Sequence, residues 1–150
     1  MKIYIASSWK NYHCVELLTW HLEEAGHTVM SFVRKAIQAE GRDLKFDIEE
    51  WIASKDGWQK FYYDLDSAMA ADVVIYIGPS GTDAWAEVGA AWAKGVPIYG
   101  LWTKGEQAGL MRLMVWWYKD VFELLKDIPT TQQCLIDIKA IKQEERELSI

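Results

Sequence analysis

The stretch VVIYI-GPSGTDAWAEVGAAWAKG, residues Val73–Gly95, decides the fold of this chain. Its apolar beginning predicts a buried strand, and its alanine-rich end predicts a helix over Asp83–Lys94 that stops at Gly95. A glycine-rich turn, Gly78–Gly81, joins the strand to the helix. In parallel α/β sheets such a turn is a common small-molecule site, because its backbone N–H groups and the helix N-terminus face the ends of the strands.

Strand-like and helix-like patterns alternate along the rest of the chain. Strands are predicted over Ile3–Ser7, Thr28–Val33, Asp72–Ile77, Pro97–Trp102 and Met114–Tyr118. Helices are predicted over Val15–Ala25, Asp47–Ala71 with a break near Lys55–Gly57, Asp83–Lys94, Asp120–Lys126 and Thr131–Leu148, and loops over Arg34–Asp47 and Thr103–Gly109. This alternation predicts a three-layer α/β/α fold around a parallel sheet of about five strands, in a flavodoxin-like or Rossmann-like order. A ligand is then expected at the carboxyl ends of the first, third and fourth strands.

Composition and charge exclude several classes of protein. The chain has 150 residues and is 51% hydrophobic, which predicts one domain over residues 1–150 with a full core. The net charge of -6 and the pI near 5.1 argue against a nucleic acid polymer as partner. The apolar runs are far too short to span a membrane, and no signal segment precedes the first strand, so we expect a cytoplasmic protein with no membrane partner. Cys14 and Cys134 lie far apart and outside any CxxC pair, which favours reduced thiols over a disulfide or a metal site, and we expect no metal and no cofactor.

The glycine turn lacks the residues of several well-known catalytic sites. No Lys-Ser or Lys-Thr pair follows it as in a P-loop, and neither GxGxxG nor GxSxG is present. Carboxylates are left as the reactive groups. Asp83 and Glu87 are four residues apart and share one face of the predicted helix, where the helix dipole is expected to keep a carboxylate ionised and ready to act as a nucleophile. Capping of the helix is an equally good interpretation of Asp83, and a solvated acid is the alternative interpretation of Glu87.

Four blocks of sequence resemble the nucleoside 2-deoxyribosyltransferase family, over roughly Ile3 to Leu113. They are Lys2-Ile3-Tyr4-Ile5-Ala6, then Asp64-Leu65-Asp66 with Ala71-Asp72-Val73-Val74, then Glu87-Val88-Gly89-Ala90-Ala91, and finally Gly109-Leu110-Met111. The third block is the most specific. The fourth resembles a loop that in this family reaches into the site of a neighbouring subunit.

The resemblance implies that Glu87 is the nucleophile, that Asp64 is the acid/base group near the nucleobase, and that Tyr4 orients the nucleophile. These roles fit the chemistry, because an N-glycosidic bond breaks through an oxocarbenium-like state that needs an anion beneath C1′ and a proton donor at the base. Without the resemblance, Tyr4 can equally be interpreted as an ordinary strand residue and Asp64 as a surface acid. The resemblance also implies that Trp9 stacks on the base. The residues expected to contact the substrate are Ser7, Trp9, Gly78, Ser80, Gly81, Thr82, Asp83 and Met111.

We therefore expect an enzyme that cleaves or exchanges the N-glycosidic bond of a nucleoside or nucleotide, with a free nucleobase as second substrate. A nucleoside 2-deoxyribosyltransferase of nucleotide salvage is the first hypothesis. A nucleoside 5′-monophosphate N-glycosidase, in which water replaces the acceptor base, is one alternative. A non-catalytic nucleotide-sensing module that binds through the same residues is the other.

The tryptophan content predicts self-association. Nine tryptophans exceed what a core of this size readily buries, and the adjacent Trp116 and Trp117 must point to opposite faces of a strand. We expect a homo-oligomer, dimer or larger, with the Gly109–Trp117 region near the contact. The helix predicted at about 131–148 is a further element that could serve assembly.

Overall fold

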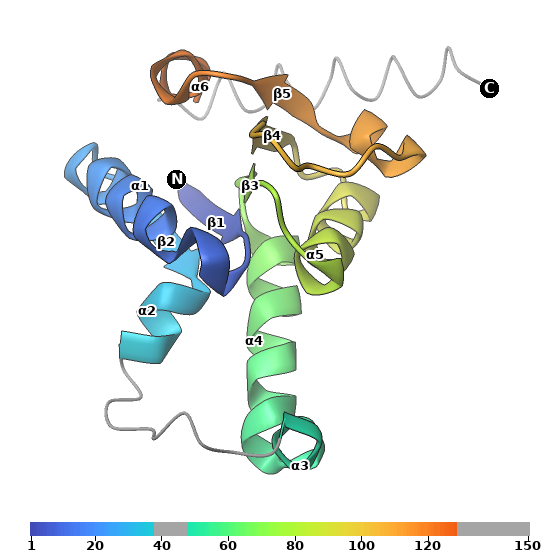
Figure 1. Cartoon of the computed structure of the whole chain (residues 1–150). Helices are drawn as coiled ribbons and strands as arrows, with labels where there is room; N and C mark the ends of the chain where they lie inside the picture. The colour runs from blue at the N-terminus through green and yellow to red at the C-terminus, as the bar shows by residue number, and fades with distance from the viewer. Residues whose placement is uncertain (38–47, 129–150) are drawn as a thin grey trace.

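A parallel sheet forms the centre of the computed structural model, which describes residues 1–37 and 48–128 (Figure 1). Its five strands lie in the order β2-β1-β3-β4-β5, and every neighbouring pair is parallel. The strands are β1 (Lys2–Ala6), β2 (Thr28–Ser31), β3 (Val73–Ile77), β4 (Ile98–Leu101) and β5 (Trp116–Tyr118). This is the flavodoxin-like order, and the predicted α/β fold with about five parallel strands is confirmed.

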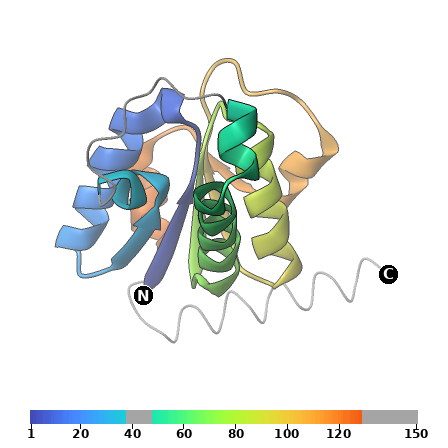
Figure 2. The ribbon, with the colours of Figure 1, turned by 90° about the horizontal axis from the view of Figure 1, so that it is seen from below.

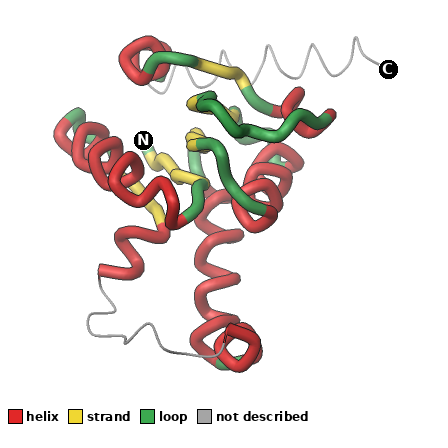
Figure 3. The backbone as a smooth tube through the Cα atoms, viewed as in Figure 1, coloured by secondary structure: helices red, strands yellow, loops and turns green. Residues whose placement is uncertain are grey.

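Helices cover both faces of the sheet. They are α1 (Tyr12–Glu24), α2 (Phe32–Ile37), α3 (Ile48–Ala53), α4 (Lys55–Ala70), α5 (Thr82–Ala93) and α6 (Val121–Asp127), with short helical turns η1 (Trp9–Asn11) and η2 (Leu110–Met114). Figure 1 shows α1 and α6 on one face and α4 and α5 on the other, and the short strands lie between these helices in Figure 3. Helices α4 and α5 pack side by side, as the view from below shows (Figure 2).

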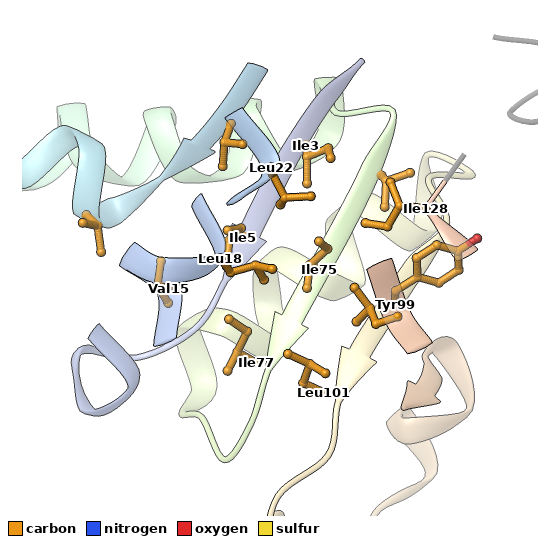
Figure 4. Close-up of a cluster of buried hydrophobic side chains, with 14 of the residues drawn as sticks. Ile3, Ile5, Val15, Leu18, Leu22, Ile75, Ile77, Tyr99, Leu101 and Ile128 are labelled. Atoms are coloured by element: carbon orange, nitrogen blue, oxygen red, sulfur yellow. The ribbon is translucent and has the colours of Figure 1, made fainter. Parts of the chain in front are cut away.

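Successive side chains of β1 point alternately to the two faces of the sheet, and each face is covered by a different layer of helices. Ile3 and Ile5 point into the core beneath α1 and α6, which is drawn in Figure 4. Tyr4 and Ala6 point the other way, into the core beneath α4 and α5. Because the period of a strand is two residues, this register puts the only buried hydroxyl of β1 on the α4/α5 side.

Side-chain caps and glycines fix the ends of the helices. The Ser54 side chain accepts a hydrogen bond from Gly57 N–H at 3.1 Å, so the predicted break in the long helical segment is a new N-cap. Asp120 caps α6 in the same way, with its Oδ1 accepting from Phe122 N–H at 2.7 Å. Gly26 and Gly95 follow α1 and α5 with φ of 87° and 78°, a conformation that glycine adopts without strain.

The predicted second strand, Thr28–Val33, is too long. The strand ends at Ser31, and Phe32 and Val33 begin α2 instead. Ser31 Oγ accepts a hydrogen bond from the backbone N–H of Arg34, as an N-cap residue does, so Arg34 belongs to this helix and not to the predicted loop. Phe32 and Val33 are still buried in the core beneath α1, and a helix satisfies their apolar pattern as well as a strand would.

Other sequence predictions differ from the structure only at their edges or fall outside the described residues. Met114 belongs to η2, so the fifth strand is shorter than predicted. Cys14 is a free, exposed thiol. Cys134 and the helix predicted at 131–148 lie outside the described residues. No helix within 1–37 and 48–128 is both long and apolar enough to cross a membrane.

Two glycines give opposite predictions for stability. A Cβ added to Gly100 on β4 would lie 2.4 Å from Val115 Cγ1, so Gly100→Ala should lower the free energy of unfolding by about 1–3 kcal/mol. A Cβ added to Gly89 on α5 would meet nothing within 4 Å, so Gly89→Ala should raise it by up to about 1 kcal/mol. Urea denaturation of both variants beside the wild type measures the two effects. Equal stability of the two variants would contradict the packing of β4 against β5.

Candidate active site

Three ionisable side chains from three elements meet on the α4/α5 side of the sheet. Tyr4 of β1 is 1% exposed and Glu87 of α5 is 9% exposed. Asp64 of α4 completes the group, and its side chain is 17% exposed. The carboxylates of Glu87 and Asp64 raise the pKa of Tyr4, and the Tyr4 hydroxyl lowers the pKa of both acids, so the three groups act on one another. The residues to which the resemblance assigns catalytic roles are therefore neighbours in space, and we call Tyr4, Asp64 and Glu87 the acid cluster.

Burial dominates the electrostatics of Glu87. Its pKa is raised from 4.5 to about 8, chiefly by removal from water and then by the nearby Asp64, while the Tyr4 hydroxyl and Lys60 oppose the rise. The interpretation of Glu87 as a solvated acid is therefore wrong, and its burial opposes the ionised state that the helix dipole was expected to favour. Glu87 lies beyond the first turn of α5, where the helix dipole has faded, and it is buried together with Ala84 and Val88 of the same helix.

Lys60, which no sequence pattern singled out, forms an ion pair with Asp64. Lys60 and Asp64 lie four residues apart on α4, and Lys60 Nζ donates a hydrogen bond to Asp64 Oδ2 within an ion pair. Burial raises the pKa of Asp64, and the ion pair with Lys60 lowers it in part. The i, i+4 spacing of a lysine and an aspartate was the signal in the sequence that could have identified this pair.

Hydrogen bonds join the loop after β1 directly to the glycine turn after β3. Ser7 Oγ donates to the carbonyl of Ile77 at 2.8 Å. Asn11 Nδ2 donates to Ser7 Oγ at 3.0 Å and to the carbonyls of Ile77 and Pro79 at 3.1 and 3.0 Å. The loops that follow β1 and β3 therefore meet at the carboxyl ends of these strands. Ser7 thus has a structural partner on the turn, and nothing in the sequence pattern singled out Asn11.

Gly78 allows a carboxylate to approach the backbone of the turn. A Cβ at this position would lie 2.0 Å from Glu106 Oε2, the same oxygen that accepts a hydrogen bond from the Tyr76 hydroxyl at 2.8 Å. Thr103 Oγ1 donates to the Gly78 carbonyl at 2.7 Å, so the loop after β4 is held against the turn. The peptide bond between Gly78 and Pro79 is cis. Glu106 is a residue of the site region that no sequence motif indicated.

The remaining residues of the turn lie at the N-terminus of α5. Gly81 is the N-cap and has no side chain to offer, so the interpretation of Asp83 as the capping residue is wrong. Thr82 and Asp83 are exposed in the first turn, and the Asp83 carboxylate raises the pKa of both Asp64 and Glu87. Ser80 Oγ is buried and has no hydrogen-bond partner in the described part of the chain. The polar groups at this end of α5 are therefore available to a ligand.

Trp9, which was predicted to stack on the base, lies on the other side of the sheet from the core that holds Tyr4. Trp9 stacks on Tyr12 with ring centroids 5.9 Å apart and meets the edge of Phe32 at 4.7 Å, on the α1 side of the sheet. Its ring is 59% exposed, and contact with a base stays a prediction. Met111 is 60% exposed on η2, and its role in the site is likewise untested.

A shallow hollow occurs elsewhere on the molecule, away from these polar groups. It lies between α1 and α2 and is lined by Glu16, Leu17, Thr19, Trp20, Val33 and Arg34. The core beneath α1 belongs to the opposite side of the sheet from the acid cluster. Among residues 1–37 and 48–128, no group of three or more His, Cys, Asp or Glu side chains is arranged to hold a metal ion.

Solved structures resemble this chain over most of its length. A 2-deoxyribosyltransferase from Bacillus psychrosaccharolyticus aligns with 83% of this chain and 90% of its own, at 23% identity and a TM-score of 0.62. A CMP N-glycosidase from Clostridium botulinum aligns with 84% of this chain and 96% of its own, at 23% identity and a TM-score of 0.53. A conserved protein from Enterococcus faecalis covers 94% of this chain, and 87% of its own length is matched, at 18% identity and a TM-score of 0.50.

These similarities concern the fold. No protein-family model matches the chain, and no curated protein matches it in sequence. The chain has the fold of a 2-deoxyribosyltransferase and of a CMP N-glycosidase, so the resemblance seen in the sequence is confirmed at the level of the fold. What the acid cluster does has to be argued from its own chemistry.

The protonated state of Glu87 predicts how stability depends on pH. Between 4.5 and about 8 the folded protein keeps a proton on Glu87 that the unfolded chain releases, so the free energy of unfolding should fall as pH rises through this window. The raised pKa of Asp64 acts in the same direction. Glu87→Gln, which mimics the protonated acid, should make the fall smaller.

Urea denaturation at several pH values across that window measures the effect. Glu24→Gln, at the exposed end of α1, is the matched control and should keep the wild-type pH dependence. An identical pH dependence in wild type and Glu87→Gln would show that Glu87 gains no proton on folding.

Proposed function

We propose that this protein breaks and re-forms the N-glycosidic bond of 2-deoxynucleosides, with Glu87 as nucleophile. The observation that carries the proposal is the burial of two carboxyl groups around one hydroxyl, contributed by α4, α5 and β1. Structural proteins rarely bury such a cluster, because each ionised group loses its hydration. Perturbed acids beside a ligand-accessible glycine turn are a common property of catalytic sites.

The reaction needs two carboxyl groups in different protonation states. One carboxylate attacks C1′ of the sugar, while a proton must reach the nitrogen of the departing base. The Asp64 carboxylate raises the pKa of Glu87, so the protonation of Glu87 depends on the charge of Asp64. A pair that keeps one proton at neutral pH can supply both the anion and the acid.

Each residue of the cluster has a role in this proposal. Glu87 forms the covalent bond to the sugar, and Asp64 donates the proton to the leaving base. Tyr4, whose buried hydroxyl lowers the pKa of Glu87, orients the nucleophile. The unpartnered hydroxyl of Ser80 and the first-turn residues Thr82 and Asp83 lie next to the cluster and are proposed to hold the sugar.

The proteins with similar folds support this choice and also define its rival. One is described as a 2-deoxyribosyltransferase and the other as a CMP N-glycosidase, so both act at N-glycosidic bonds. Transfer requires a free base to reach the glycosyl-enzyme before water does. Chromatography of deoxynucleosides, ribonucleosides and their 5′-monophosphates, each with and without a free base, separates the activities.

The assay has three informative outcomes. A new deoxynucleoside formed faster than free deoxyribose supports the transferase. Release of sugar phosphate from 5′-monophosphates alone would establish the hydrolase instead. Binding of nucleotides without any turnover would leave a sensing module as the function and overturn the proposal.

The nucleophile is tested by substitution and by trapping. Glu87→Gln keeps the shape of the buried side chain but cannot attack C1′, so turnover should fall at least about 1,000-fold. Asp66→Asn, an exposed acid on α4 two residues from Asp64, is the control and should keep wild-type turnover. Intact-protein mass spectrometry with a 2-fluoro-2-deoxynucleoside should detect a glycosyl adduct, and peptide mapping should place it on Glu87. Wild-type turnover by Glu87→Gln would remove Glu87 from the mechanism.

We also propose that the protein is a homo-oligomer that associates through η2. Leu110, Met111 and Leu113 on this short turn are 79%, 60% and 86% exposed, and Trp116 on the neighbouring edge strand is 38% exposed. Trp117 packs inward against Trp85, as expected for adjacent residues on a strand. A patch of this kind at a sheet edge is unusual on a monomer.

Leu113→Lys tests the oligomer. Sedimentation of the wild type should give a mass of at least twice 17.3 kDa, and the variant should dissociate towards the monomer. Leu17→Lys, an equally apolar site on α1 that is 68% exposed, is the control and should leave the mass unchanged. A monomeric wild type at micromolar concentration would contradict the proposal.

A further inference from the structure

Glu106 holds its carboxylate over the glycine turn from a neighbouring loop. It lies in the loop after β4, and its Oε2 accepts a hydrogen bond at 2.8 Å from the hydroxyl of Tyr76 on β3. Gly78 makes room for this oxygen, because a Cβ at Gly78 would overlap it. Thr103 Oγ1 donates to the Gly78 carbonyl at 2.7 Å and ties the same two loops together. A carboxylate is therefore fixed beside the turn without being a member of the acid cluster.

The strand register places Glu106 on the same side of the sheet as the acid cluster. Tyr76 pairs with Ala6 of β1, two residues beyond the pair formed by Tyr4 and Val74. These four residues all belong to the core beneath α4 and α5. Two residues of a strand span about 7 Å, and here the offset runs towards the carboxyl ends of the strands. Tyr76, which holds Glu106, therefore lies further towards the ligand end of the sheet than Tyr4 does.

The position of Glu87 directs a bound sugar towards the glycine turn. Side chains of a helix lean towards its N-terminus, and the N-cap of α5 is Gly81, the last residue of the turn. A sugar whose C1′ meets the Glu87 carboxyl therefore lies between the acid cluster and the turn. In the proposed reaction Asp64 serves the base, so the opposite end of the sugar, which carries the 5′ group, faces the turn and Glu106.

Two opposing effects act on a 5′ group in this position. The backbone N–H groups at the start of α5 carry about half a positive charge, and on their own they would favour a 5′-phosphate. Glu106 at the turn and Asp83 in the first turn of α5 add two carboxylates, and a phosphate carries a charge of about −1.5 to −2 at pH 7. Among the described residues, no lysine or arginine forms an ion pair with Glu106. Full charges act more strongly than the partial charge of a helix end, so repulsion of the phosphate is the larger effect.

A free 5′-hydroxyl is uncharged and can donate a hydrogen bond to a carboxylate. A carboxylate accepts at about four lone-pair positions, and the Tyr76 hydroxyl uses one of those on Glu106. A hydrogen bond to an ionised acceptor is about twice as strong as one between neutral groups. Resting on the proposed function, we propose that Glu106 determines specificity by selecting nucleosides with a free 5′-hydroxyl over nucleoside 5′-monophosphates. Tyr76 is its positioning residue.

Glu106→Gln tests the selection. Glutamine keeps the shape of the side chain, and its amide oxygen can accept the hydrogen bond from Tyr76, but the charge is lost. We measure kcat/KM for a 2-deoxynucleoside and for its 5′-monophosphate, each with the same acceptor base. The wild type should prefer the nucleoside at least about 100-fold, and Glu106→Gln should reduce this preference at least about 10-fold.

The control removes the same charge from the other side of the sheet. Glu123→Gln, at an exposed position of α6, should keep the wild-type preference. An unchanged preference in an active Glu106→Gln variant, or an equal loss of kcat/KM for both substrates, would overturn the selection and leave the proposed function standing. A wild type that prefers the monophosphate would overturn the selection as well. If the wild type turns over neither substrate, the proposed function fails and the selection fails with it.

Tyr76→Phe tests whether the position of the carboxylate matters, because it leaves the charge of the protein unchanged. The hydrogen bond to Glu106 is lost, while the ring keeps its contact with Trp85, whose centroid is 4.7 Å away. The preference for the nucleoside should fall at least about 3-fold. An unchanged preference would show that Tyr76 does not position Glu106.

Salt dependence tests the repulsion without any substitution, and so covers the case in which a variant does not fold. Raising the ionic strength from about 0.01 M to about 0.15 M shortens the Debye length from about 30 Å to about 8 Å. In the wild type, kcat/KM for the monophosphate should then rise at least about 3-fold, whereas kcat/KM for the nucleoside should not change. An unchanged value for the monophosphate, or a fall caused by weaker attraction to the start of α5, would overturn the proposal.

Discussion

The removal of Glu87 from water is the constraint on which the rest of the site depends. A carboxyl group that is 9% exposed cannot remain ionised at neutral pH without strong compensation, and the compensation here is incomplete. Lys60 and the Tyr4 hydroxyl stabilise the anion, but burial and Asp64 outweigh them. Burial therefore favours the protonated form of Glu87 and disfavours two charges side by side in the cluster. A cluster of this kind can change which member is charged without changing its total charge.

The scaffold around the cluster keeps these groups in place with few degrees of freedom. β1 is an inner strand, paired with β2 on one side and β3 on the other, so the position of Tyr4 is set by two ladders of backbone hydrogen bonds. The packing of α4 on α5 sets the separation of Asp64 and Glu87. Asn11 ties the loop after β1 to the glycine turn, and that turn begins α5. Rigid elements supply the reacting groups, while the turn at the end of the sheet supplies polar groups for a ligand.

Much of the fold could be predicted from the sequence, because the signals that define it are local. The apolar run Val73–Ile77, the glycine turn and the alanine-rich helix occur where they were expected, and so does the parallel sheet. The main error is α2. Phe32 and Val33 continue the apolar run of β2, and only the hydrogen bond from Arg34 N–H to Ser31 Oγ, which is a feature of the folded backbone, distinguishes a helix start from two more strand residues.

The site was less predictable, for reasons that are equally physical. Spacing alone does not bring Tyr4, Asp64 and Glu87 together; the resemblance to a family suggested it, and the strand order explains it. The rise in the pKa of Glu87 was not predicted, because the position of a residue in a helix can be read from a sequence but its depth of burial cannot. Burial has the larger effect on the pKa of Glu87, because the helix dipole acts only over the first turn, whereas desolvation acts wherever a side chain enters the core. The depth at which Glu87 is held therefore favours its protonated form, and any chemistry that uses it as a nucleophile has to overcome the cost of a buried charge.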